Sequence, residues 1–128
     1  MKSILDTNVL LRFLVGDNLA QKNQAAVWFK EAEQGMRDIA VHPLVVAESC
    51  FVLESVYGKP RDEIAYALEV FLTQRWLGVV ERDALALTWS GYRSGLHFVD
   101  SFLIALAQLQ SAELLTFDKR VLTFYSRG

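Results

Sequence analysis

The chain has 128 residues, 52% of them hydrophobic, so it is long enough for one buried core and too short for two ordinary domains; we expect a single domain over residues 1–128. Its net charge of −2 argues against a protein that binds nucleic acid by positive charge alone, unless a divalent cation reverses the sign of an acidic site. Cys50 is the only cysteine, which excludes an internal disulfide and a cysteine-clustered zinc site.

Short apolar segments alternate with amphipathic segments along the whole chain. A first strand is expected at residues 3–5, followed by helices at residues 8–14 and 19–34. The second of these helices carries an apolar stripe of helical period, formed by Ala25, Trp28, Phe29 and Ala32.

The rest of the chain repeats this order. A second strand at residues 39–41 precedes a helix that begins at Pro43, because proline suits the first turn of a helix. An apolar stripe over residues 64–72 predicts a further helix, which pairs with the previous one as a helical hairpin. The remaining elements are expected as a strand at residues 77–80, helices at residues 83–92 and 99–109, and a strand at residues 114–117. Together they predict an α/β domain with a mainly parallel central sheet.

The hydrophobic segments are too short to span a membrane. Polar residues such as Asp6 and Asp100 interrupt them before they reach the roughly 20 apolar residues that a spanning helix needs. The charge of Asp6 also falls where a signal peptide would need its apolar stretch. We therefore expect a cytoplasmic protein without a membrane partner, and the single cysteine fits a reducing compartment.

Two aspartates directly follow predicted strands. Asp6 follows Ile4 and Leu5, and Asp118 follows the strand at residues 114–117. Ligands bind at the carboxyl edge of open parallel sheets, so both residues are site candidates. Taken singly, each is as well explained by helix capping or by a turn.

Two further acids lie in apolar helices. Glu48 falls between apolar residues of its helix, where an unpaired carboxylate would be costly to bury, whereas Glu54 on the far side is expected to reach solvent. Asp100 stands where an apolar helix begins, and capping is its simplest explanation. Four acids in such places would repel one another, and a bound cation explains them jointly.

The ligand chemistry predicts a hard cation. Carboxylate oxygens, with hydroxyl and amide groups from Thr7, Asn8, Ser101 and Thr116 nearby, suit Mg²⁺ or Mn²⁺ rather than zinc. A loose acidic Mg²⁺ site typically acts on a phosphate ester.

Four segments carry a resemblance to a known family. Residues 5–11 (Leu-Asp-Thr-Asn-Val-Leu-Leu), 45–48 (Val-Val-Ala-Glu), 98–105 (Phe-Val-Asp-Ser-Phe-Leu-Ile-Ala) and 115–119 (Leu-Thr-Phe-Asp-Lys) resemble the four motifs of PIN domains, in the right order over nearly the whole chain. Among PIN domains the sequence is most similar to VapC-type toxins.

The resemblance implies a PIN-like three-layer α/β/α domain and an endoribonuclease that depends on Mg²⁺ or Mn²⁺. It also implies homodimerisation, an RNA substrate and inhibition by a cognate VapB-type antitoxin. By motif, Asp6 and Asp100 would be the main metal ligands, Glu48 and Asp118 would complete the acidic quartet, and Asn8 and Thr116 would support it. His97 stands where many relatives carry an acid, so a fifth acidic ligand is not expected.

Several other polar residues near these motifs have weaker cases. His97 could take part in proton transfer, although a lone histidine before a helix is more often a surface or capping residue. Arg12, Lys119 and Arg120 could hold RNA phosphates, and single surface cations are common without such a role.

Two other functions are open to the same sequence. An aspartyl-phosphate phosphatase also begins with a strand and an aspartate, but its motif needs a second aspartate where this chain has Asn8. A PIN domain that only binds RNA or a regulator would fit the low positive charge, whereas the presence of all four acids favours an enzyme.

Overall fold

The structure of the chain, a computed structural model, describes the backbone of residues 1–127 and the side chains of residues 1–126. Three strands form a parallel sheet in the order β1-β2-β3: β1 (Lys2–Ile4), β2 (Asp38–Val41) and β3 (Leu77–Val79). In the register of this sheet Ile4 lies opposite Ala40, which lies opposite Gly78. The three strands expected before residue 81 are therefore confirmed.

Seven helices, joined by loops, lie between and after the strands of the described chain. They are α1 (Thr7–Val15), α2 (Leu19–Glu33), α3 (Pro43–Ser55), α4 (Arg61–Leu72), α5 (Arg82–Arg93), α6 (Phe98–Gln110) and α7 (Lys119–Arg127). Local signals set several boundaries: Gly16 ends α1 in the left-handed conformation at φ 73°, and the Asn18 side chain accepts a hydrogen bond from the Gln21 N–H at the start of α2. Seven helices and a three-stranded parallel sheet confirm the mixed α/β class, consistent with a PIN-like α/β/α fold.

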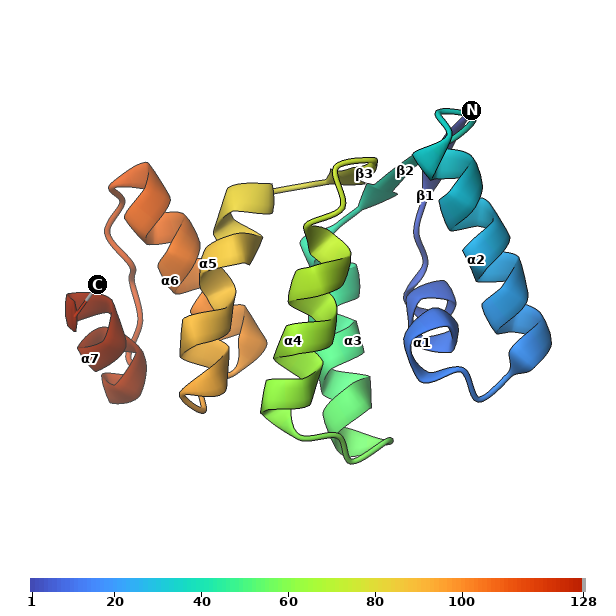
Figure 1. Cartoon of the computed structure of the whole chain (residues 1–128). Coiled ribbons are helices and arrows are strands. Elements are labelled where there is room, and N and C mark those ends of the chain that lie inside the picture. Colours follow the sequence, from blue (N-terminus) through green and yellow to red (C-terminus); the bar gives the residue numbers. More distant parts are fainter. Residues whose placement is uncertain (128) are drawn as a thin grey trace.

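The helices pack mainly in sequence order (Figure 1). The pair α1 and α2 lies at one end of the molecule, α3 and α4 lie in the middle, and α5, α6 and α7 lie beyond them. Ile39, Val41 and Leu77 of the sheet are buried in the main core, where the rings of Phe13 and Phe29 meet edge to face at 4.8 Å. A smaller core of Leu96, Ile104 and Val121 joins α6 to α7.

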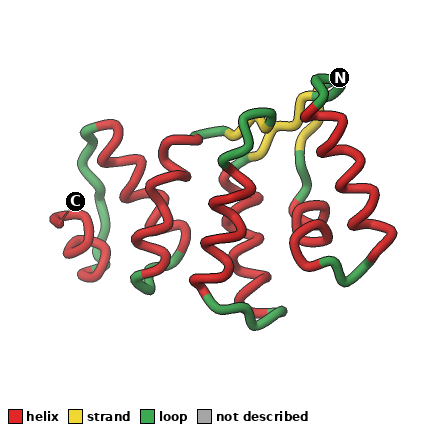
Figure 2. Tube along the Cα trace, in the orientation of Figure 1, coloured by secondary structure: helices red, strands yellow, loops and turns green. Residues whose placement is uncertain are grey.

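The C-terminal region differs from the sequence prediction. Residues 114–117 form no strand, and the chain continues into α7, which was not predicted. Figure 2 shows this stretch as part of the loop between α6 and α7, away from the sheet. A strand needs a hydrogen-bonded neighbour, and within one chain these residues have none.

Candidate active site

Asp6 stands at the carboxyl end of β1 with its side chain exposed. It occupies the N-cap position of α1, yet its carboxylate accepts no capping hydrogen bond. The capping explanation therefore does not account for this side chain. Thr7 is buried beside it, whereas Asn8 is exposed and lines a small pocket together with Arg12 and Trp28.

The expected burial of Glu48 is wrong. Glu48 is exposed on α3, and so are Leu44 and Phe51, which share its face of the helix. Glu54, expected in solvent, is instead partly buried and accepts hydrogen bonds from Arg61 Nε at 3.2 Å and from the Tyr92 hydroxyl at 2.9 Å. The helical period separated these two faces correctly, but it did not show which of them meets α5.

Asp100 lies in the first turn of α6 and is half-buried. His97, and not Asp100, occupies the N-cap position, and neither side chain makes a capping hydrogen bond. The carboxylate of Asp100 is thus left without the structural role that capping would give it, and His97 is exposed at the helix entrance.

Asp118 does have a structural role. Its Oδ1 accepts hydrogen bonds from the backbone N–H groups of Arg120 at 2.8 Å and Val121 at 3.2 Å, which caps the start of α7. Thr116 supports the same turn, since its hydroxyl accepts a hydrogen bond from the Asp118 N–H at 3.1 Å. One carboxylate oxygen of Asp118 remains outside these bonds.

The four acids do not form one cluster within a single chain. Among residues 1–127, no three His, Cys, Asp or Glu side chains lie close enough to hold a metal ion. Oxygen donors of this kind suit Mg²⁺ or Mn²⁺, but their arrangement in one chain does not complete a metal centre.

The Arg12 side chain is held by hydrogen bonds to nearby residues of the N-terminal part of the chain. Its Nη1 donates to both oxygens of Asp17 at 3.0 Å, and its Nε donates to Gln21 at 2.9 Å. The Tyr57 hydroxyl donates to Asp17 at 2.8 Å, and this bond is the main reason why the pKa of Asp17 lies below its usual value. Arg12 therefore joins α1 to the loop before α2, to Gln21 of α2 and to Tyr57, just after α3.

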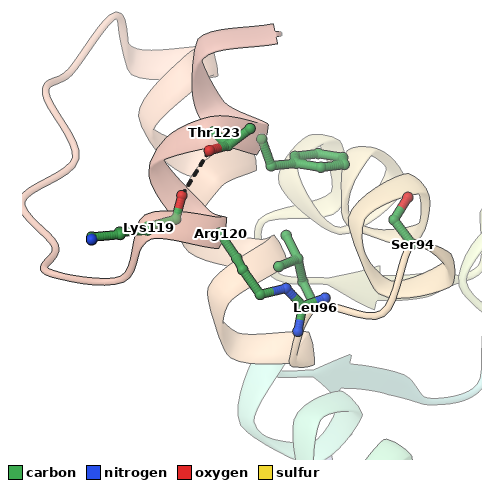
Figure 3. Close-up of a pocket in the computed structure, with 6 residues that line it drawn as sticks. Ser94, Leu96, Lys119, Arg120 and Thr123 are labelled. Atoms are coloured by element: carbon green, nitrogen blue, oxygen red, sulfur yellow. Dashed lines mark hydrogen bonds between the residues drawn. The ribbon is translucent and has the colours of Figure 1, made fainter.

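Lys119 and Arg120 border a basic pocket of about 340 Å³ (Figure 3). Ser94, Leu96, Thr123 and Phe124 complete its lining. Neither cation forms an ion pair with another residue in the described part of the chain. In Figure 3 the side chain of Arg120 reaches toward Leu96, whereas that of Lys119 points away from Ser94. Ser94 and Thr123 were not identified from the sequence, because nothing local connects residue 94 to residue 123.

A second group of polar side chains, also missed by sequence analysis, joins α3 and α4 to α5. Besides its contact with Glu54, Arg61 donates to the carbonyl oxygens of Tyr92 at 2.7 Å and Leu96 at 2.6 Å. Its guanidinium lies 4.4 Å from the centre of the Tyr92 ring. Burial, followed by the charge of Glu54, raises the pKa of the neighbouring Cys50 thiol to about 12, so Cys50 is a packed thiol and not a nucleophile.

Comparison with protein families assigns the class of this domain. The model of the PIN domain matches residues 3–126, so the chain belongs to the PIN domain family. No curated protein and no solved structure matched the chain. PIN domains are generally nucleases that act on RNA, typically with divalent metal ions such as Mg²⁺. No helix within residues 1–127 is long and apolar enough to cross a membrane.

Proposed function

We propose that this PIN domain is an endoribonuclease that depends on Mg²⁺ or Mn²⁺ and is the VapC-type toxin of a toxin–antitoxin pair. The observation that carries the proposal is Asp6, whose carboxylate is exposed at the carboxyl edge of the sheet and free of the capping role that would otherwise explain it. A cytoplasmic location is part of the same proposal.

The proposed metal ligands are Asp6, Glu48, Asp100 and Asp118. Glu48 and Asp100 make no hydrogen bond or ion pair with another described side chain, which leaves their oxygens available. Asn8 and Thr116 lie beside two of the acids as supporting groups. Lys119 and Arg120 are the proposed contacts to RNA phosphates, since their charges are not neutralised within residues 1–127. Arg12, paired with Asp17, has a weaker claim to that role.

RNA cleavage with purified protein tests the proposed function. We expect cleavage to require Mg²⁺ or Mn²⁺, and we expect Asp6→Asn or Asp100→Asn to lower it by about a hundredfold or more while leaving the domain folded. Asp38→Asn is the matched control, because Asp38 is an exposed aspartate at the opposite, amino edge of the sheet. If both site variants cleave RNA like the control at every metal concentration, the proposed site is wrong and the domain is better described as a binding module.

An apolar groove between three helices supports the proposed VapB-type partner. It has a volume of about 550 Å³, lies between α1, α2 and α4, and is lined mainly by apolar side chains, among them Phe13, Phe29, Tyr66, Val70 and Trp76. Such a groove suits the apolar face of an amphipathic helix. A basic side chain from the same segment could then pair with the site carboxylates.

A metal series tests this form of control. Inhibition by the product of an adjacent small reading frame should weaken as Mg²⁺ or Mn²⁺ is raised, because the basic side chain and the metal ion compete for the same carboxylates. Replacing that basic residue should weaken inhibition more than it weakens docking. A partner that binds tightly and leaves RNA cleavage unchanged at every metal concentration would contradict this account.

A further inference from the structure

The first strand of the sheet has a free edge. β1 pairs with β2 on one side and has no strand on the other within residues 1–127. Met1 and Leu5 bond to β2, so the backbone groups of Lys2 and Ile4, which alternate with them, point away from it. The Ile4 side chain is 76% exposed. An unpaired edge with an exposed apolar side chain such as Ile4 is a template for another strand.

A strand-forming segment without a partner strand lies near the other end of the chain. Residues 114–117 read Leu-Leu-Thr-Phe, a composition that favours strands, but they form no backbone hydrogen bond to another described residue. Leu115 is 83% exposed and Phe117 is fully exposed. Leu114 packs against the small core of α6 and α7, but the segment has no partner strand, and Leu115 and Phe117 lack the apolar cover that such residues normally have.

The two features are far apart in one molecule. Figures 1 and 2 show β1 at one end and the loop before α7 at the other, with α3 and α4 between them. Since β2 and β3 occupy the sheet on the side of β1 that faces the C-terminal helices, residues 114–117 do not reach the free edge of their own chain.

The four acids of the proposed site are also divided between the two parts of the molecule. Asp6 and Glu48 belong to the part of the chain before residue 81, Asp100 and Asp118 belong to the part after it, and no three of them meet. Exposed apolar residues flank two of the acids: Leu44 and Phe51 lie on the Glu48 face of α3, and Val99 and Leu103 lie beside Asp100 on α6. Both faces are suited to burial against another surface.

We propose that two copies of this chain complete each other, and that residues 114–117 of each copy pair in parallel with β1 of the other. Parallel pairing places Asp118 of one copy next to Asp6 of the other, because each aspartate directly follows its strand segment. The exposed face of α6 from one copy then covers the exposed face of α3 in the other, and Asp100 approaches Glu48. Each acidic centre is thus built from two copies.

This inference rests on the proposed function for its activity test, but its first test needs no activity. In a Cys50→Ser background, one chain carries Ile4→Cys and a second chain carries Thr116→Cys. Mild oxidation of the mixture should give a disulfide-linked pair of the two different chains, because the substituted positions lie on neighbouring strands. Replacing Ile4→Cys by Leu19→Cys, an exposed position at the start of α2, gives a matched control that should not cross-link above background.

The second test is complementation between inactive variants. Asp6→Asn and Asp100→Asn are each inactive alone, but a mixed pair holds one centre with both aspartates intact. After subunit exchange the mixture should recover about a quarter of the wild-type RNA cleavage, since half of the pairs are mixed and each has one intact centre of two. The wild-type activity per chain should also fall on dilution.

The outcomes separate the two proposals. Cross-linking with the Thr116→Cys chain and recovery of cleavage in the mixture support both. Cleavage by a wild-type monomer, with no cross-link and no recovery in the mixture, overturns the exchange and leaves the proposed function standing. Specific cross-linking between the Ile4→Cys and Thr116→Cys chains, together with a wild-type protein that never cleaves RNA, supports the exchange and overturns the proposed function.

Discussion

Replacing Arg61 tests how the half of the molecule that carries Asp100 is held against the half that carries Glu48. Arg61 on α4 donates to the carbonyl oxygens of Tyr92 and Leu96 at the end of α5 and just beyond it. In Arg61→Leu both carbonyls lose a charged donor and Glu54 loses its cation. Because the Arg61 side chain is 28% exposed, water replaces part of the lost hydrogen bonding. We therefore use the low end of the range for hydrogen bonds to charged groups, about 1.5 kcal/mol for each bond to a carbonyl.

We therefore expect Arg61→Leu to lower the free energy of unfolding by about 3 kcal/mol and the Tm by about 10 °C. Arg61→Lys keeps the charge but loses the forked geometry, so it should lose about half as much. Urea denaturation followed by circular dichroism measures the free energy of unfolding of both variants. The matched control is Arg75→Leu, at an exposed arginine after α4, for which we expect a change of about 0.5 kcal/mol or less. If Arg61→Leu is as stable as this control, the contacts of Arg61 do not hold the two halves together.

Three further changes test separate features of the structure. Burial raises the pKa of Cys50 from 9.0 to about 12, so above pH 9 the folded thiol stays protonated while the unfolded thiol ionises. The free energy of unfolding should therefore fall above pH 9 by about 1.4 kcal/mol per pH unit, and Cys50→Ser should remove this contribution. Identical pH profiles of both proteins from pH 8 to 10.5 would contradict the prediction. Asp118→Asn keeps an acceptor for the cap of α7 and should abolish RNA cleavage at unchanged stability, whereas Asp118→Ala should also lose about 1 kcal/mol; equal stability of the two would show that the cap is dispensable. Gly91→Ala would place a Cβ 2.8 Å from the Ser101 hydroxyl oxygen and push α5 away from α6. It should lower the free energy of unfolding by about 1–3 kcal/mol. An unchanged Tm would refute this close contact.

Local sequence patterns were enough to predict most helices and strands of the domain. Apolar periodicity and Pro43 predicted three strands and six helices close to their observed positions, because hydrogen bonds and side-chain stripes within a helix involve residues only three or four apart. The signal for α7 was also present and was missed: Val121, Phe124 and Tyr125 recur at helical spacing behind the capping Asp118.

Properties that depend on residues distant in the chain could be read only from the folded structure. Periodicity placed Glu48 and Glu54 on different faces of α3, but only the tertiary contacts show that the Glu48 face is exposed and that Glu54 pairs with Arg61 and Tyr92. Residues 114–117 have the composition of a strand, but a strand exists only where another backbone supplies its hydrogen bonds, and within one chain none does. The sequence therefore identified the acids of the proposed site, whereas their distances from one another depend on contacts between segments that no local pattern encodes.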